Sequence, residues 1–72
     1  MSQKLFVEFR QGTDGFAAEA SCRETGMTCI TYTTNSPNGG VRVEGEVEGD
    51  AEAFVEAVKS RSGGVEFAGK AG

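Results

Sequence analysis

The chain has 72 residues, a formal net charge of −4 and 38% hydrophobic residues, a composition that fits one small domain over residues 1–72. An acidic balance of this kind disfavours a nucleic-acid-binding role that depends on phosphate contacts. Histidine is absent, which excludes nucleophile pairs built on histidine and every metal site with a histidine ligand. We therefore expect no nucleic-acid partner, no metal and no cofactor.

The sequence contains no signal-peptide pattern and no apolar run long enough to span a membrane. Its two cysteines, Cys22 and Cys29, do not form the dense pattern of a disulfide-stapled domain. These features predict a cytoplasmic protein with reduced thiols and no membrane partner.

Residues Lys4–Arg10 are predicted to form the first strand. Leu5, Val7 and Phe9 share one face of such a strand, which we expect to be buried. Phe6 falls on the opposite face, which a single layer of helices would leave open. Phe6 is therefore a candidate contact residue.

Residues Gln11–Gly15 predict a turn, and Thr13 or Asp14 can begin a helix there. The alanine-rich segment Phe16–Thr25 predicts the first helix, which Gly26 ends. The threonine-rich segment that follows predicts the second strand, Thr28–Thr34.

This second strand has no charged residue and no internal proline, so its edge is open to pairing with another strand. We assign Ile30 and Tyr32 to one face of the strand. The other face and the following loop supply candidate partner-binding residues: Cys29, Thr31, Thr33, Asn35 and Asn38.

The segment Val41–Glu48 predicts the third strand, because valines alternate with charged residues along it. Gly45 takes a position on the valine side, which indicates a bulge or the close approach of a helix. The charged side presents Glu44, Glu46 and Glu48, which form either a solvated face or a docking patch for a basic surface.

Asp50 is expected to cap a second helix that extends to Arg61, with Gly63-Gly64 ending it. Phe54 and Val58 lie on its apolar side. The segment Gly64–Ala68 predicts a fourth strand with Val65 and Phe67 pointing inward, and residues 69–72 are expected to form a frayed tail.

The resulting order is β-α-β-β-α-β, which predicts an α+β domain of ferredoxin-like fold with a four-stranded antiparallel sheet and two helices on one face. Right-handed crossovers are expected to place the first and third strands side by side and parallel, with the second and fourth strands at the edges. The alternative is a helix-poor antiparallel sheet in which residues 16–25 form no helix.

The run Asn35-Ser-Pro-Asn-Gly-Gly-Val41, the alternating valines and glutamates after it, and Gly49-Asp50 together resemble the acylphosphatase family. The resemblance covers Tyr32–Val65 and implies the same fold, with Asn35 positioning an attacking water. That family holds phosphate in a glycine-rich loop with an arginine at the start of the first helix. The matching residues 11–16 contain glycines but no arginine, and Asp14 would repel a phosphate.

The leading hypothesis is a non-catalytic protein-interaction or regulatory module, such as a small acidic inhibitor or accessory protein that covers a basic surface of a larger protein. Its partner would be another protein, or a second copy bound through the edge of the second strand. The alternatives are an acylphosphatase-like hydrolase of acyl phosphates and a homodimeric small-ligand regulatory domain. The candidate partner-binding residues are Phe6, Cys29, Thr31, Thr33, Asn35, Asn38, Glu44, Glu46 and Glu48.

Overall fold

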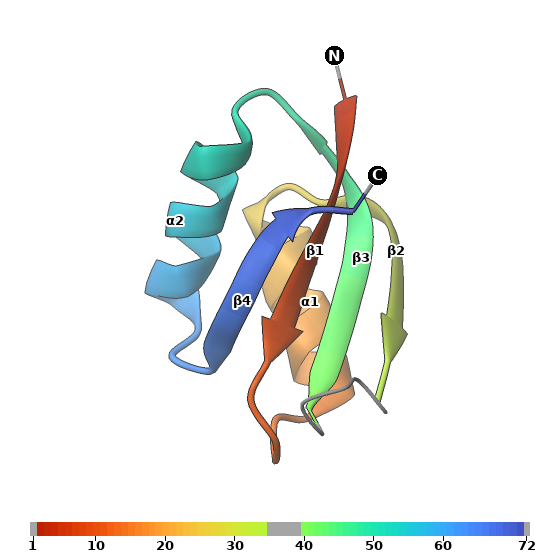
Figure 1. Cartoon of the computed structure of the whole chain (residues 1–72), viewed down its shortest axis with the longest axis vertical. Coiled ribbons are helices and arrows are strands. Elements are labelled where there is room, and N and C mark those ends of the chain that lie inside the picture. The colour runs from red at the N-terminus through yellow and green to blue at the C-terminus, as the bar shows by residue number, and fades with distance from the viewer. Residues whose placement is uncertain (1, 35–39, 72) are drawn as a thin grey trace.

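A computed structural model describes residues 2–34 and 40–71. Their elements follow the expected β-α-β-β-α-β order, and one sheet joins the strands in the order β2-β3-β1-β4 (Figure 1). This arrangement confirms an α+β ferredoxin-like fold, and the alternative without a first helix is wrong. The elements are β1 (Ser2–Phe9), α1 (Gly15–Thr25), β2 (Thr28–Thr33), β3 (Val41–Glu48), α2 (Ala51–Arg61) and β4 (Val65–Lys70).

The two central strands, β1 and β3, run antiparallel, and the expectation that they are parallel is wrong. β4 also runs antiparallel to β1, and β2 runs antiparallel to β3. The reason lies in the connections. Helix α1 returns the chain so that β2 runs in the same direction as β1, and β3 then reverses before it inserts between them. The inserted strand is therefore antiparallel to both neighbours.

The core lies between the sheet and the two helices, as the alternation in β1 and β3 predicted. One residue in it was not anticipated: Met27, in the connection from α1 to β2, is only 1% exposed. It packs against β3 where Gly45 replaces a side chain, because a Cβ there would lie 2.5 Å from the Met27 Cγ. The buried residues are Leu5, Val7, Phe9, Ala18, Cys22, Met27, Val41, Val43, Val47, Phe54 and Val58.

Both helices begin and end close to the predicted residues. The Asp50 side chain accepts a hydrogen bond of 3.1 Å from the backbone N–H of Glu52, which fixes the start of α2. Asp14 precedes α1 but its side chain makes no such bond. Gly26 ends α1 with a φ of 122°, a conformation that favours glycine.

A bulge interrupts β2. Thr28 pairs with Glu46 and Thr31 pairs with Glu44, so Cys29 and Ile30 together lie opposite Gly45. Cys29 adopts the left-handed conformation with a φ of 53°, which is uncommon for a residue with a Cβ. The sequence indicated a bulge or a close approach at Gly45, and the structure shows a bulge in the facing strand together with the approach of Met27.

A second bulge lies in β4 and overturns one prediction. β1 advances one residue from Phe9 to Glu8 while β4 advances two, from Val65 to Phe67. The alternation of β4 is therefore shifted by one. Phe67, expected to point inward, lies opposite Glu8 and is 59% exposed, while Ala68 packs against the core.

The fourth strand also extends further than expected. β4 continues to Lys70, and the backbone N–H of Ala71 donates a hydrogen bond of 2.9 Å to the carbonyl of Lys4. Residues 69–71, assigned above to a frayed tail, thus belong to the sheet or are bonded to it. β4 extends this far because β1 is long and provides backbone hydrogen-bond partners as far as Lys4.

Candidate binding surface on the open face of the sheet

One face of the sheet carries both helices, and the other is uncovered (Figure 1). We call the uncovered side the open face. The strand register brings together side chains from all four strands there, since Phe6 lies opposite Glu44, and Thr33 lies opposite Arg42. The open face comprises Lys4, Phe6, Glu8, Thr31, Thr33, Arg42, Glu44, Glu46, Glu48 and Phe67.

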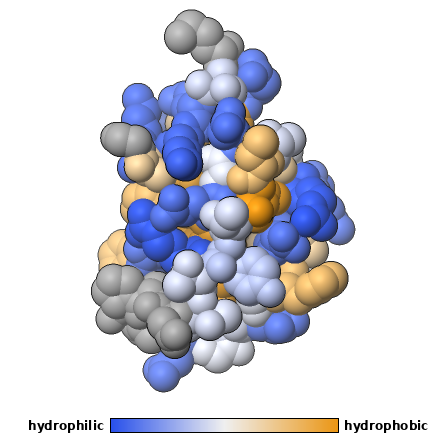
Figure 2. Space-filling view, turned by 90° about the vertical axis from the view of Figure 1, so that its right-hand side faces the viewer, coloured by the Kyte–Doolittle hydropathy of each residue, from blue (hydrophilic) through white to orange (hydrophobic). Residues whose placement is uncertain are grey.

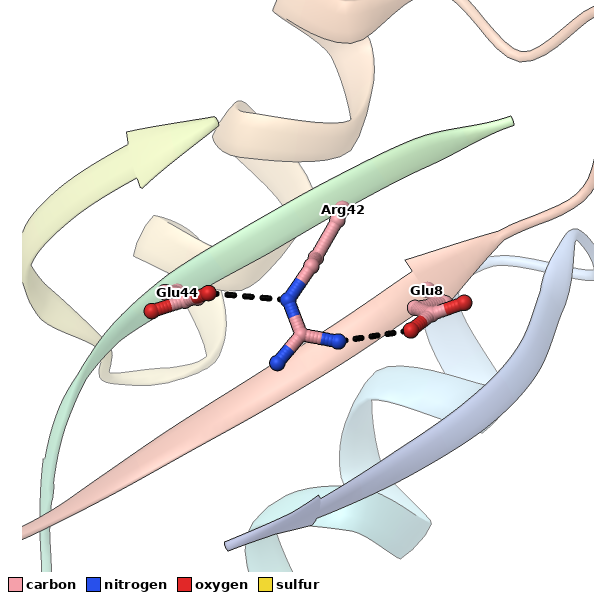
Figure 3. Close-up of polar contacts among 3 residues, drawn as sticks. All are labelled: Glu8, Arg42 and Glu44. Carbon is pink, nitrogen blue, oxygen red and sulfur yellow. Dashed lines mark hydrogen bonds and ion pairs between the residues drawn. The ribbon is translucent and has the colours of Figure 1, made fainter. Parts of the chain in front are cut away.

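Arg42 lies at the centre of this surface (Figure 3). Its Nη1 donates a hydrogen bond of 2.6 Å to the Glu8 carboxylate on β1, and its Nε donates one of 2.8 Å to the Glu44 carboxylate on its own strand. Its guanidinium carbon lies 4.1 Å from the centre of the Phe6 ring. The arginine is therefore held in one position by two carboxylates and one aromatic face.

The electrostatics of this cluster favour the charged arginine. The hydrogen bond to Glu44 is the largest effect that raises the pKa of Arg42 above its ordinary value, and the bond to Glu8 adds to it, while burial opposes both. Glu8 and Arg42 form an opposite-charge pair across neighbouring strands, a type of pair that stabilises a sheet.

Phe6 lies on the open face, as its position in the sequence predicted. Arg42 covers its ring, and on the other strand a Cβ added at Gly69 would lie 3.4 Å from the same ring. Phe6 is consequently half-buried. The Phe6 ring contacts the Arg42 guanidinium, and this contact leaves less of the ring exposed for a partner.

The exposed aromatic of the open face is Phe67 instead, which sequence reasoning assigned to the core. No signal in the periodicity of Val65–Lys70 marks the bulge, because Val65 and Phe67 alternate as in a regular inward-facing strand. A large apolar side chain thus lies 59% exposed on the same face as the ion-pair cluster of Arg42.

The predicted acidic residues share this face but are partly engaged within the chain. Glu44 pairs with Arg42, and Glu46 accepts a hydrogen bond of 3.1 Å from the hydroxyl of Ser2. Glu48, at the end of β3, lies opposite Ser2. Carboxylates still outnumber cations on the open face, so the surface is negative overall.

The remaining candidates lie along β2, the edge strand that faces the viewer in Figure 2. A pale, weakly polar band runs down the middle of that view between more hydrophilic zones (Figure 2). Thr31 and Thr33 are exposed there, and Cys29 occupies the bulge. Bulges of this kind make an edge less open to pairing than the sequence suggested. Asn35 and Asn38 lie outside the described residues.

Comparisons with protein-family models, curated proteins and solved structures found no match. The resemblance of residues 32–65 to acylphosphatases thus stays a prediction. Within residues 2–34 and 40–71, no group of three or more histidine, cysteine, aspartate or glutamate side chains could hold a metal ion. In the same residues, neither helix is long and apolar enough to cross a membrane.

The two arginines that flank residues 11–16 in the sequence, Arg10 and Arg23, make contacts elsewhere in the structure. Arg10 follows β1, and its side chain passes beside Gly64 at the start of β4. Arg23 lies in the last turn of α1, where it pairs with Glu19 at 3.0 Å. The ring of Tyr32 covers Gly15 at the start of α1, where a Cβ would lie 2.7 Å from it.

Proposed function

We propose that this chain is a non-catalytic protein-interaction module that binds a basic surface of a larger protein through the open face of its sheet. The observation that carries the proposal is that Phe67, 59% exposed, shares the open face with the Arg42 side chain, which Glu8, Glu44 and the Phe6 ring hold in place. Aromatic side chains and arginine are also the residue types enriched in binding hot spots.

The cluster around Arg42 supports the same proposal. Two carboxylates and the Phe6 ring already fix this side chain, so little conformational entropy is lost when a partner covers it. The surplus of carboxylates would attract lysine and arginine side chains and speed association with a basic surface.

Affinity capture with matched variants tests the proposal. The immobilised wild type is compared with Phe67→Ser and Glu46→Lys, which change the open face, and with Glu24→Lys, which makes the same charge change on α1. We expect a protein with a basic surface that wild type and Glu24→Lys retain equally, and that each open-face variant retains at least about tenfold less.

Each variant must keep the wild-type circular dichroism spectrum, which is expected because all three side chains lie on the surface of the fold. A partner that all four proteins retain equally would overturn the proposal, as would the loss of binding by Glu24→Lys alone.

A second candidate function is the acylphosphatase-like hydrolysis of acyl phosphates, which the shared fold and the resemblance of residues 32–65 support. It predicts that the chain hydrolyses benzoyl phosphate and that Asn35→Ala abolishes the reaction. Under the leading proposal, the rate with wild type equals the rate in buffer.

A third candidate is a strand-pairing module that binds a second copy or a partner strand along β2. The uncharged, exposed edge of this strand supports it. The bulge at Cys29 and Ile30 limits regular pairing to the residues that follow, Thr31–Thr33. The oligomeric state distinguishes this candidate from the leading one.

A further inference from the structure

A groove of about 510 Å³ lies between α2 and β4, on the helix side of the sheet. Leu5 of β1, Ala51 and Val55 of α2, and Ala68 of β4 line it with apolar surface. Figure 1 shows that α2 and β4 diverge from the loop that joins them toward the start of α2.

The bulge in β4 explains why this space is not filled. Without the shift in register, Phe67 would lie opposite Val7 and face the helix side of the sheet, in the position that Ala68 now occupies. With the bulge, Phe67 lies on the open face, and the inward position belongs to Ala68, whose side chain is a single methyl group. The same bulge therefore exposes an aromatic side chain on one side of the sheet and leaves a groove on the other.

The helix contributes more apolar surface than the core uses. Phe54 and Val58 are buried against the sheet, whereas Ala51 and Val55, also four residues apart, are only partly buried and face the groove. A helix whose apolar stripe is wider than its contact with the core has surface available for a second helix.

The charges at the rim define what could fill the groove. Glu52 and Glu56 are exposed on α2, one helical turn apart, and Lys70 lies on the β4 side. Among the residues that the structure describes, neither glutamate forms an ion pair. Two carboxylates against one ammonium group make the rim attractive to cations.

We propose that this groove binds a basic amphipathic helix of a partner protein. The two glutamates are separated by about 6 Å along the axis of α2, a spacing that matches lysines or arginines four residues apart on a second helix. Apolar residues of that helix would enter the groove above Val55 and Ala68. The proposal is separate from the one for the open face, since it involves neither Phe67 nor Arg42.

A synthetic peptide of about 15 residues, long enough to form a helix, is the probe. It carries leucines at positions i, i+4 and i+7, lysines four residues apart beside them, and a fluorophore at one end. Binding to the full chain is followed by fluorescence anisotropy. Shifts in the methyl NMR signals of Val55 and Ala68 locate the site.

We expect saturable binding that the double variant Glu52→Lys/Glu56→Lys weakens at least about tenfold. The charge control is Glu19→Lys/Glu24→Lys, which makes the same charge change on α1 and should bind as wild type does. Because it also removes the ion pairs of Glu19 with Arg23 and of Glu24 with Arg61, it must keep the wild-type circular dichroism spectrum. A second variant, Ala68→Leu, fills the groove without changing charge and should weaken binding to a similar degree. Phe67→Ser should leave binding unchanged, which separates this site from the open face.

Four results would overturn the proposal. The first is no binding to wild type at peptide concentrations up to about 1 mM, a limit that corresponds to roughly 4 kcal/mol. The second is equal weakening by the α1 control, which would show attraction to net charge alone. The third is unchanged binding of the peptide to Ala68→Leu. The fourth is equally tight binding to wild type of a peptide in which glutamates replace the lysines.

Discussion

The two cysteines occupy opposite environments, although the sequence treats them alike. Cys22 is fully buried, and desolvation raises the pKa of its thiol to about 12, whereas Cys29 is exposed at the bulge of β2. We predict that at pH 8 a disulfide reagent modifies Cys29 at least about a hundredfold faster than Cys22, which reacts only when the fold opens. Cys29→Ser should remove the fast phase. Two fast thiols in the native wild type would contradict this assignment.

The raised pKa of Cys22 also makes stability depend on pH. Its folded pKa of about 12 exceeds the value near 8.5 that is usual for an unfolded thiol. The stabilising contribution is therefore complete below the unfolded pKa and is lost as pH rises toward the folded one, at roughly 1.4 kcal/mol per pH unit. Urea unfolding between pH 8 and pH 11 should show this loss in wild type and a smaller one in Cys22→Ala. Equal slopes would indicate that other groups cause the dependence.

Gly45 is required for packing rather than for backbone conformation. A Cβ there would lie 2.5 Å from the Met27 Cγ and 2.7 Å from the carbonyl oxygen of Thr28. Because the backbone oxygen cannot move freely, we expect Gly45→Ala to lower the free energy of unfolding by about 1–3 kcal/mol. Gly63→Ala is the control, since nothing lies within 4 Å of the corresponding Cβ and little change is expected. Denaturant titrations of the two variants should therefore differ clearly.

At the scale of elements, the two helices begin in different ways. The Asp50 side chain accepts a hydrogen bond at the start of α2, while Asp14 makes none at the start of α1. Asp50→Ala should thus cost about 1 kcal/mol and Asp14→Ala less than half of that. Thermal unfolding followed by circular dichroism can rank the two variants. Equal losses would indicate a contribution through charge alone, and the reverse ranking would contradict a stabilising hydrogen bond at Asp50.

Most elements could be predicted because their signals are local. The alternation of Val41–Glu48, the cap at Asp50 and the glycine at position 26 each depend on nearby residues, and each is confirmed. The open face could also be predicted, since alternation in β1 and β3 assigns its charged residues.

The error at Phe67 originates in a bulge, a feature that depends on pairing between distant strands. The inward assignment of Phe67 assumed an uninterrupted period of two, and the shift in β4 arises only against β1. The groove beside α2 results from the same shift, so it could not be predicted from the sequence either. Met27 was missed because it lies in a connection, where no periodicity applies.

At the scale of the whole molecule, the leading proposal predicts a monomer. The β2 edge has a bulge, and its regular part is short, so it offers little backbone for pairing with a second copy. Light scattering at micromolar concentration, with reductant present, should give the mass of one chain, 7.5 kDa. A dimer that Thr33→Lys converts to monomer would favour the strand-pairing candidate instead. A dimer that this variant leaves intact would indicate a different interface.

The position of β1 has a consequence for how the protein is made. β1 is synthesised before both of its neighbours in the sheet, β3 and β4, and β4 is the last element of the described chain. Until β4 has been synthesised, the apolar strand from Leu5 to Phe9 has an unprotected edge. A chain cut off after α2 should consequently aggregate rather than fold, and tags at the carboxyl end that delay pairing of β4 should lower the soluble yield.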